Sequence, residues 1–237
     1  MRTRIIQNEP EPEPETESPA VTEVAPVVDR RETLLRRGFL LVAVVGYFLV
    51  GAIHPADVKV GDETTLYLWI HLLQPVLILL LAWGFWLLVK DLPGRAAQIA
   101  RVAIVPYAIV YAMFDAIAGV AIGTVVREGS RMSAAEGAAV QRVFDDADGV
   151  TQALSAGFYV AAGLAWLVMA VAAAVAVRQL GGLGPTLLMA VGAAIFAVGH
   201  PFPPGPIGIA LFGLGLAWLE LRREEAKAPE AQPVPAP

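Results

Sequence analysis

Asp115 is the only acidic residue within the apolar stretch 106–123. Residues four apart share one face of a helix, so Tyr107, Tyr111, Gly119 and Gly123 would line up with Asp115. A carboxyl group facing lipid would cost at least about 2.5 kcal/mol, so we expect Asp115 to face the interior of a helical bundle or a water-filled cavity. In that position Asp115 is the candidate catalytic acid or base, and the two glycines favour close helix packing.

The three histidines are predicted to lie on one side of the membrane. His54 and His200 each end an apolar run and precede a proline, and His71 lies six residues inside the next run, about 9 Å deep. Counted in the same way from the outer end of its own span, Asp115 lies about 16 Å deep, near the middle of the bilayer. Further polar residues lie on helix faces that could line the space between the histidines and Asp115. Together they predict a polar cavity that is open to the outside. These candidate cavity-lining residues are Tyr67, Gln74, Tyr107, Tyr111, Gln152, Ser155 and Tyr159.

The first functional hypothesis is a divalent-metal site. Imidazole nitrogens suit zinc above all, and three protein ligands with one water molecule make the water acidic enough for hydrolysis. His54, His71 and His200 would be the ligands, with Asp115 or an acid of the loop 127–149 as a fourth ligand. Such a protein would be a membrane hydrolase, although the chain contains no HExxH, HxxxH or HxxEH motif.

Two alternatives come from other functional classes. A b-type haem could be held between two histidines on different spans, for example His71 and His200, and would indicate a redox role. A small proton-coupled or cation-coupled carrier, or an accessory subunit, would use Asp115 as the titrating group, and we expect a carrier of this size to form homo-oligomers.

Other classes are excluded by residues that the chain lacks. The sequence has no cysteine, which excludes disulfides, thiolate metal ligands and a cysteine nucleophile. No lysine lies within an apolar run, so a retinal Schiff base is excluded, and neither a phosphate-binding loop nor a basic surface for nucleic acid is present. Membrane lipids are the expected partners, together with any unknown protein that docks on a terminal tail.

The composition predicts an all-α polytopic membrane protein. Hydrophobic residues make up 57% of the 237 residues, charged residues 16%, and the mean hydropathy is +0.62. We expect a membrane domain over 30–223 with an outer loop at 127–149 that holds a short amphipathic helix, and disordered tails at 1–29 and 224–237. The six predicted transmembrane helices cover residues 38–53, 65–89, 97–126, 150–177, 185–199 and 207–221.

The distribution of positive charge predicts the orientation. Six spans put both termini on one side of the membrane, and that side carries eleven lysines and arginines near the spans, against four on the other. The positive-inside rule therefore predicts cytoplasmic termini in a plasma or cytoplasmic membrane, and it places the three histidines toward the outside.

Overall fold

The computed structural model describes residues 30–55, 58–62, 64–199 and 203–225, and this part of the chain is helical, without strands. The predicted all-α helical bundle is therefore confirmed. The helices are α1 (Arg30–Ile53), α2 (Thr65–Val89), α3 (Arg95–Phe114), the π-helix η1 (Asp115–Ala121), α4 (Ile122–Gly129), α5 (Ala134–Ala176), α6 (Arg178–Gly181), α7 (Leu183–Val198) and α8 (Pro204–Glu225).

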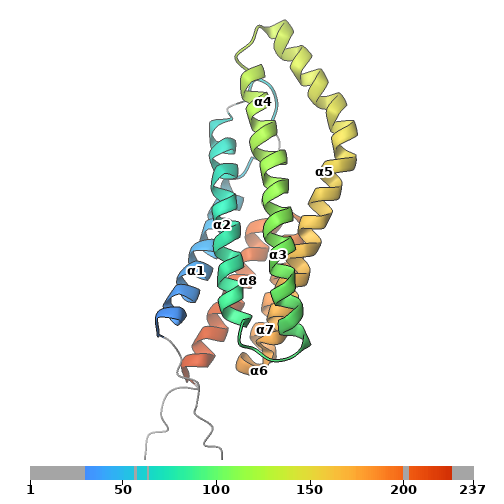
Figure 1. The fold of residues 1–237 in the computed structure, drawn as a ribbon. Coiled ribbons are helices and arrows are strands. Elements are labelled where there is room, and N and C mark those ends of the chain that lie inside the picture. Colours follow the sequence, from blue (N-terminus) through green and yellow to red (C-terminus); the bar gives the residue numbers. More distant parts are fainter. Residues whose placement is uncertain (1–29, 56–57, 63, 200–202, 226–237) are drawn as a thin grey trace, which may run out of the picture.

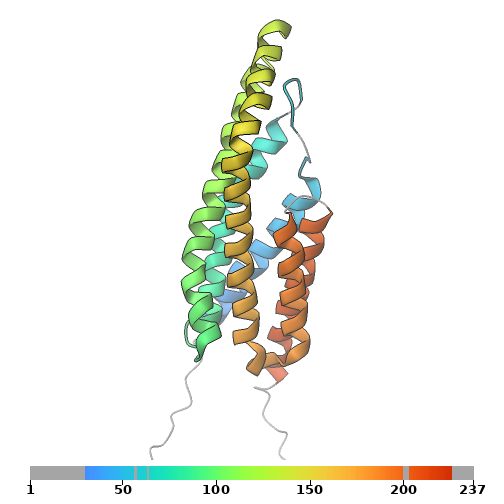
Figure 2. The same ribbon diagram turned by 90° about the vertical axis from the view of Figure 1, so that its right-hand side faces the viewer.

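The long helices alternate in direction along one bundle (Figures 1 and 2). Five segments of the described chain are long and apolar enough to cross a membrane: α1, α2, the continuous run Arg95–Gly129, the second half of α5, and α8. The sixth pass, α7, has 16 residues and is about 24 Å long, slightly less than a bilayer core of about 30 Å. The chain is an integral membrane protein, and the described part holds five helices of spanning length together with the shorter apolar α7.

The centre of the bundle packs aromatic, aliphatic and small side chains, and its outer surface is also largely apolar. Trp166, Tyr107, Phe85 and Phe212 are fully buried at its centre. The outer surface carries side chains such as Val102, which is 73% exposed, as expected of a surface that faces lipid. Lipid offers no hydrogen-bond partners, so a polar side chain within a membrane-spanning helix finds them inside the bundle.

α7 and α8 cross with their backbones almost in contact. A Cβ atom built on Gly192 would lie 2.4 Å from the backbone nitrogen of Phe212, and one on Gly208 would lie 2.4 Å from that of Phe196. Small residues allow this approach, which is a common basis of helix association in membranes. The α7–α8 pair therefore tolerates no side chain at either glycine.

Ion pairs fix the end of the bundle where α1 begins and α8 ends, which we call the arginine end. Arg36 Nη2 lies 2.9 Å from Glu220 Oε1, and Arg37 Nε lies 2.7 Å from Glu220 Oε2. On the neighbouring helices, Lys90 Nζ lies 2.7 Å from Glu32 Oε2. These ion pairs tie the described start of α1 to the end of α8 and to the end of α2.

The opposite end, which we call the hairpin end, extends well beyond the other helices (Figure 2). α5 has 43 residues and is about 64 Å long, twice a bilayer core. Its start has the predicted capping box, in which Ser133 N donates to Glu136 Oε2 at 3.0 Å. The prediction of a separate amphipathic helix before span four was wrong, because no proline interrupts 134–176 and the helix continues without a break.

Candidate functional site

Three residues predicted to carry chemistry form one row of contacts near the hairpin end. His54 directly follows α1, His71 lies on α2, and Asp115 begins the π-helix η1. His54 Nε2 lies 3.1 Å from His71 Nε2, and His71 Nδ1 lies 2.6 Å from Asp115 Oδ1. We call these three residues the His–His–Asp chain.

Burial increases along the His–His–Asp chain, from His54 to Asp115. His54 is half-buried beside the α1–α2 connection, whereas His71 and Asp115 are 2% and 1% exposed. The chain therefore joins a partly accessible imidazole to a carboxyl group that is sealed inside the bundle. The sequence suggested that His71 and Asp115 line an open cavity. In the structure both side chains are buried and contact each other.

The π-helix and its glycine bring Asp115 to His71. A π-turn adds a residue to the helix and often occurs at functional sites. A Cβ atom on Gly119, one turn after Asp115, would lie 2.0 Å from His71 Cγ, and one on Gly123 would lie 2.8 Å from Tyr67 Cδ1. The predicted role of these glycines in close packing is confirmed, and Gly119 leaves the space that the His71 ring fills.

Tyr67 supports the two imidazole rings without joining the chain. Its ring centroid lies 4.3 Å from that of His71 and 5.6 Å from that of His54. Its hydroxyl donates to the carbonyl oxygen of Ala118 in the π-helix at 2.7 Å. Tyr67 thus ties α2 to η1 and restricts the motion of both rings.

The depth predicted for Asp115 needs correction. Counting from residue 126 placed Asp115 about 7 Å deeper than His71, yet the two side chains are hydrogen-bonded. The cause is the length of the third pass, whose 35 residues extend beyond the start of α2, so the two counts did not begin at the same level.

The hydrogen-bond acceptors decide where the protons lie. Pro55 O can only accept, so His54 Nδ1, 2.6 Å away, must donate to it. Burial and the neighbouring His71 lower the pKa of His54 to about 4, so this imidazole is neutral at pH 7 and its Nε2 is an acceptor. His71 Nε2 must then donate to His54. One further proton is shared between His71 Nδ1 and Asp115 Oδ1, whichever atom holds it.

Unpaired polar atoms lie next to this chain. In the described residues, Asp115 Oδ2 and both polar atoms of the Gln74 amide are buried without a hydrogen-bond partner. Gln74 is one turn along α2 from His71 and has no exposed surface. Buried polar atoms are nearly always paired, so these three are available to a proton or a small polar ligand.

The other predicted cavity residues are distributed around the aromatic core. The Tyr107 hydroxyl lies 3.5 Å from that of Tyr47, a buried residue of α1 that the sequence did not single out. Tyr111 packs against Tyr47 with ring centroids 6.5 Å apart, and Tyr159 donates to the carbonyl of Val198. His200 and the side chains of Gln152 and Ser155 lie outside the described residues.

The described part of the chain offers few ligands for the predicted metal ion or haem. No group of three histidine or acidic side chains is placed there to hold a metal ion. Both ring nitrogens of His71 already contact His54 and Asp115, which leaves no face of that imidazole open to a haem iron. Comparisons with protein-family models, curated proteins and solved structures gave no match.

Proposed function

We propose that this membrane protein moves protons along the His–His–Asp chain, as part of a small proton-coupled carrier or of an accessory subunit of one. The carrying observation is the unbroken series of hydrogen bonds Asp115–His71–His54, of 2.6 and 3.1 Å, which ends at a partly accessible imidazole. A buried acid joined to histidines is how membrane pumps and transporters relay protons.

The relay is balanced in protons and keeps both imidazoles neutral. Asp115 gives its proton to His71 Nδ1, His71 Nε2 gives its own to His54 Nε2, and His54 Nδ1 releases one to water at the α1–α2 connection. Asp115 becomes a carboxylate, and each imidazole changes tautomer. The reverse sequence returns a proton to Asp115, and net transport would then pass a proton on from Asp115 Oδ2 toward the arginine end, in which direction Gln74 lies one turn beyond His71 on α2.

Orientation follows the charge distribution. Ten of the eleven lysines and arginines counted on the predicted cytoplasmic side belong to described residues at the arginine end. The positive-inside rule then puts both termini in the cytoplasm and His54 toward the outside, so that protons would enter Asp115 from the outer surface.

The test is proton entry into lipid vesicles. Purified protein is reconstituted around a trapped pH-sensitive dye, and a potassium diffusion potential drives protons inward. We expect wild-type vesicles to acidify faster than empty ones, and Asp115→Asn and His71→Gln to return the rate to that of empty vesicles. Gly38→Ala is the control, because a Cβ atom there meets nothing within 4 Å and the residue lies outside the His–His–Asp chain.

A second candidate is the metal site, now with His54 and His71 as ligands and Asp115 as the group that orients His71. Two nitrogens bound to one tetrahedral zinc ion at 2.0–2.1 Å lie about 3.3 Å apart, close to the 3.1 Å seen here. A carboxylate on the remaining ring nitrogen is the usual support of a metal-binding histidine. His200 stays a predicted third ligand, and hydrolysis would need a zinc-bound water.

Metal analysis separates the two candidates. Near-stoichiometric zinc that is lost in His71→Gln would favour the metal site and its hydrolase activity. Metal-free protein that conducts protons would favour the relay. A Soret band in the absorption spectrum would instead support haem b.

A further inference from the structure

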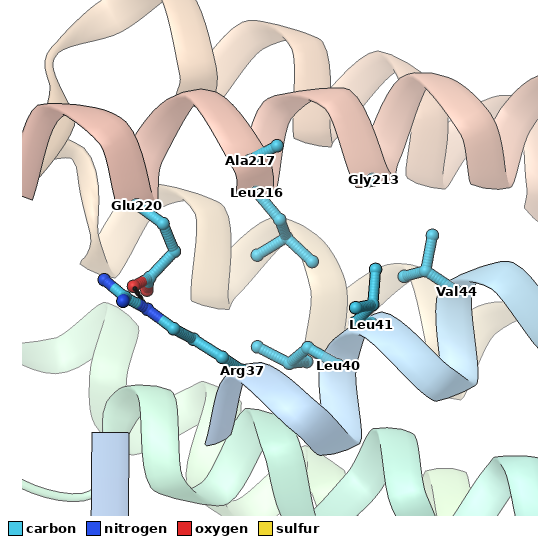
Figure 3. Close-up of a pocket in the computed structure, with 8 residues that line it drawn as sticks. All are labelled: Arg37, Leu40, Leu41, Val44, Gly213, Leu216, Ala217 and Glu220. Atoms are coloured by element: carbon cyan, nitrogen blue, oxygen red, sulfur yellow. Dashed lines mark hydrogen bonds and ion pairs between the residues drawn. The ribbon is translucent and has the colours of Figure 1, made fainter. Parts of the chain in front are cut away.

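A groove between α1 and α8 opens to the lipid-facing surface at the arginine end (Figure 3). Its volume is about 220 Å³, below the range of about 300–1,000 Å³ usual for drug-sized ligands. Six apolar residues line it: Leu40, Leu41, Val44, Gly213, Leu216 and Ala217. From Arg37 to Val44, α1 rises about 10 Å, which gives the groove the length of part of one acyl chain.

The two ends of the groove differ chemically. At one end Gly213 faces Val44, and a Cβ atom on Gly213 would lie 2.5 Å from Val44 Cγ1, so the helices meet there. At the other end Arg37 and Glu220 bridge the helices, as Figure 3 shows. A ligand with an apolar chain and a polar head fits only with its head at Arg37.

The charge around that head position is positive. The described ends of α1 and α8 carry six arginines, at positions 30, 31, 36, 37, 222 and 223, against four glutamates, at positions 32, 220, 224 and 225. Arg37, which lines the groove, is paired with Glu220 and Glu224 at 2.7 and 2.6 Å, yet its side chain stays 36% exposed. The surplus favours an anionic head group, since each arginine near an anionic lipid surface contributes about 1 kcal/mol.

We infer that this groove binds a phospholipid with an anionic head group, with part of one acyl chain between α1 and α8 and the phosphate beside Arg37. The site is separate from the His–His–Asp chain and does not depend on the proposed relay. An acyl chain there would fill the space between two helices that meet at Gly213 and at Glu220, and so would stabilise the contact of the first and last passes.

The test is lipid binding measured by native mass spectrometry of detergent-purified protein, titrated with phosphatidylglycerol or phosphatidylcholine. We expect tighter binding of phosphatidylglycerol. Ala217→Phe fills the groove from an exposed position and should weaken binding at least tenfold, whereas Ala161→Phe, also at an exposed position, should have no effect. Arg37→Gln should weaken phosphatidylglycerol about fivefold and leave phosphatidylcholine unchanged.

Arg131→Gln is the matched charge control, because Arg131 is 65% exposed at the hairpin end. Equal affinity for the two lipids, or unchanged binding in Ala217→Phe, would overturn the inference. So would a wild-type dimer that Ala217→Phe converts to a monomer, because a second copy of the chain would then occupy the groove.

Discussion

The Gly119→Ala substitution tests whether the π-helix positions Asp115 against His71. The new methyl group would lie 2.0 Å from His71 Cγ and 2.2 Å from Nδ1, well inside the ordinary contact distance of about 3.5 Å. The ring cannot retreat, because the rings of His54 and Tyr67 pack against it with centroids 5.0 and 4.3 Å away. His71 and Asp115 must therefore separate.

The magnitude follows from three terms. Overpacking costs about 1–3 kcal/mol, and loss of a hydrogen bond to a charged group costs about 1.5–3 kcal/mol. Alanine regains about 1 kcal/mol over glycine in a helix. The free energy of unfolding should fall by about 1.5–5 kcal/mol, which lowers the melting temperature by about 3–20 °C for a chain of this size.

The assay is thermal unfolding in detergent, followed by tryptophan fluorescence, together with proton entry into vesicles. Gly38→Ala is the control, since a Cβ atom there meets nothing within 4 Å. Gly119→Ala should be less stable than this control and should admit protons no faster than empty vesicles. A variant as stable and as active as Gly38→Ala would refute the packing argument.

Three further predictions address other parts of the structure. Gly208→Ala places a methyl group 2.4 Å from a backbone nitrogen, which cannot move aside, so folded protein should be lost in gel filtration, and a normal elution profile would contradict this. Glu220→Gln leaves the buried Arg36 without a carboxylate and should cost up to about 3 kcal/mol in thermal unfolding; equal loss in the exposed control Glu128→Gln would count against it. The pKa of His54 is about 4 in the folded protein, against an ordinary value of 6.5. The contribution of His54 to the free energy of unfolding is therefore fully present above pH 6.5, and that free energy falls by up to about 3 kcal/mol as the pH drops toward 4. His54→Gln should remove that part of the pH dependence of the melting temperature, and an identical pH profile in both proteins would exclude it.

Hydropathy and helix-breaking residues predicted most of the fold. α2 matches its predicted bounds, because polar residues and a proline-containing turn flank one apolar run. The ion pairs of Arg36 and Arg37 could not be predicted, since their partner Glu220 lies nearly two hundred residues away in the sequence. The continuous α5 was missed because amphipathic and apolar helix segments look like separate elements when their junction lacks a breaker.

The sequence predicted the members of the site better than their arrangement. An intramembrane Asp115 and His71 each required a buried polar partner, and the structure brings them together with His54. Two features had no signal in the sequence. The π-turn gives no hydropathy pattern, and Tyr47 is a single tyrosine in an apolar run whose partner, Tyr107, comes sixty residues later.

The central claim is that Asp115, His71 and His54 share one hydrogen-bonded chain. The protein contains three histidines, so nitrogen-15 NMR of histidine-labelled protein in bilayers gives few ring signals. Substituting each histidine by glutamine assigns these signals. The relay predicts a hydrogen-bonded Nε2–H on His71, and it predicts that Asp115→Asn shifts the ring signals of both His71 and His54. Unchanged His54 signals in Asp115→Asn would contradict it.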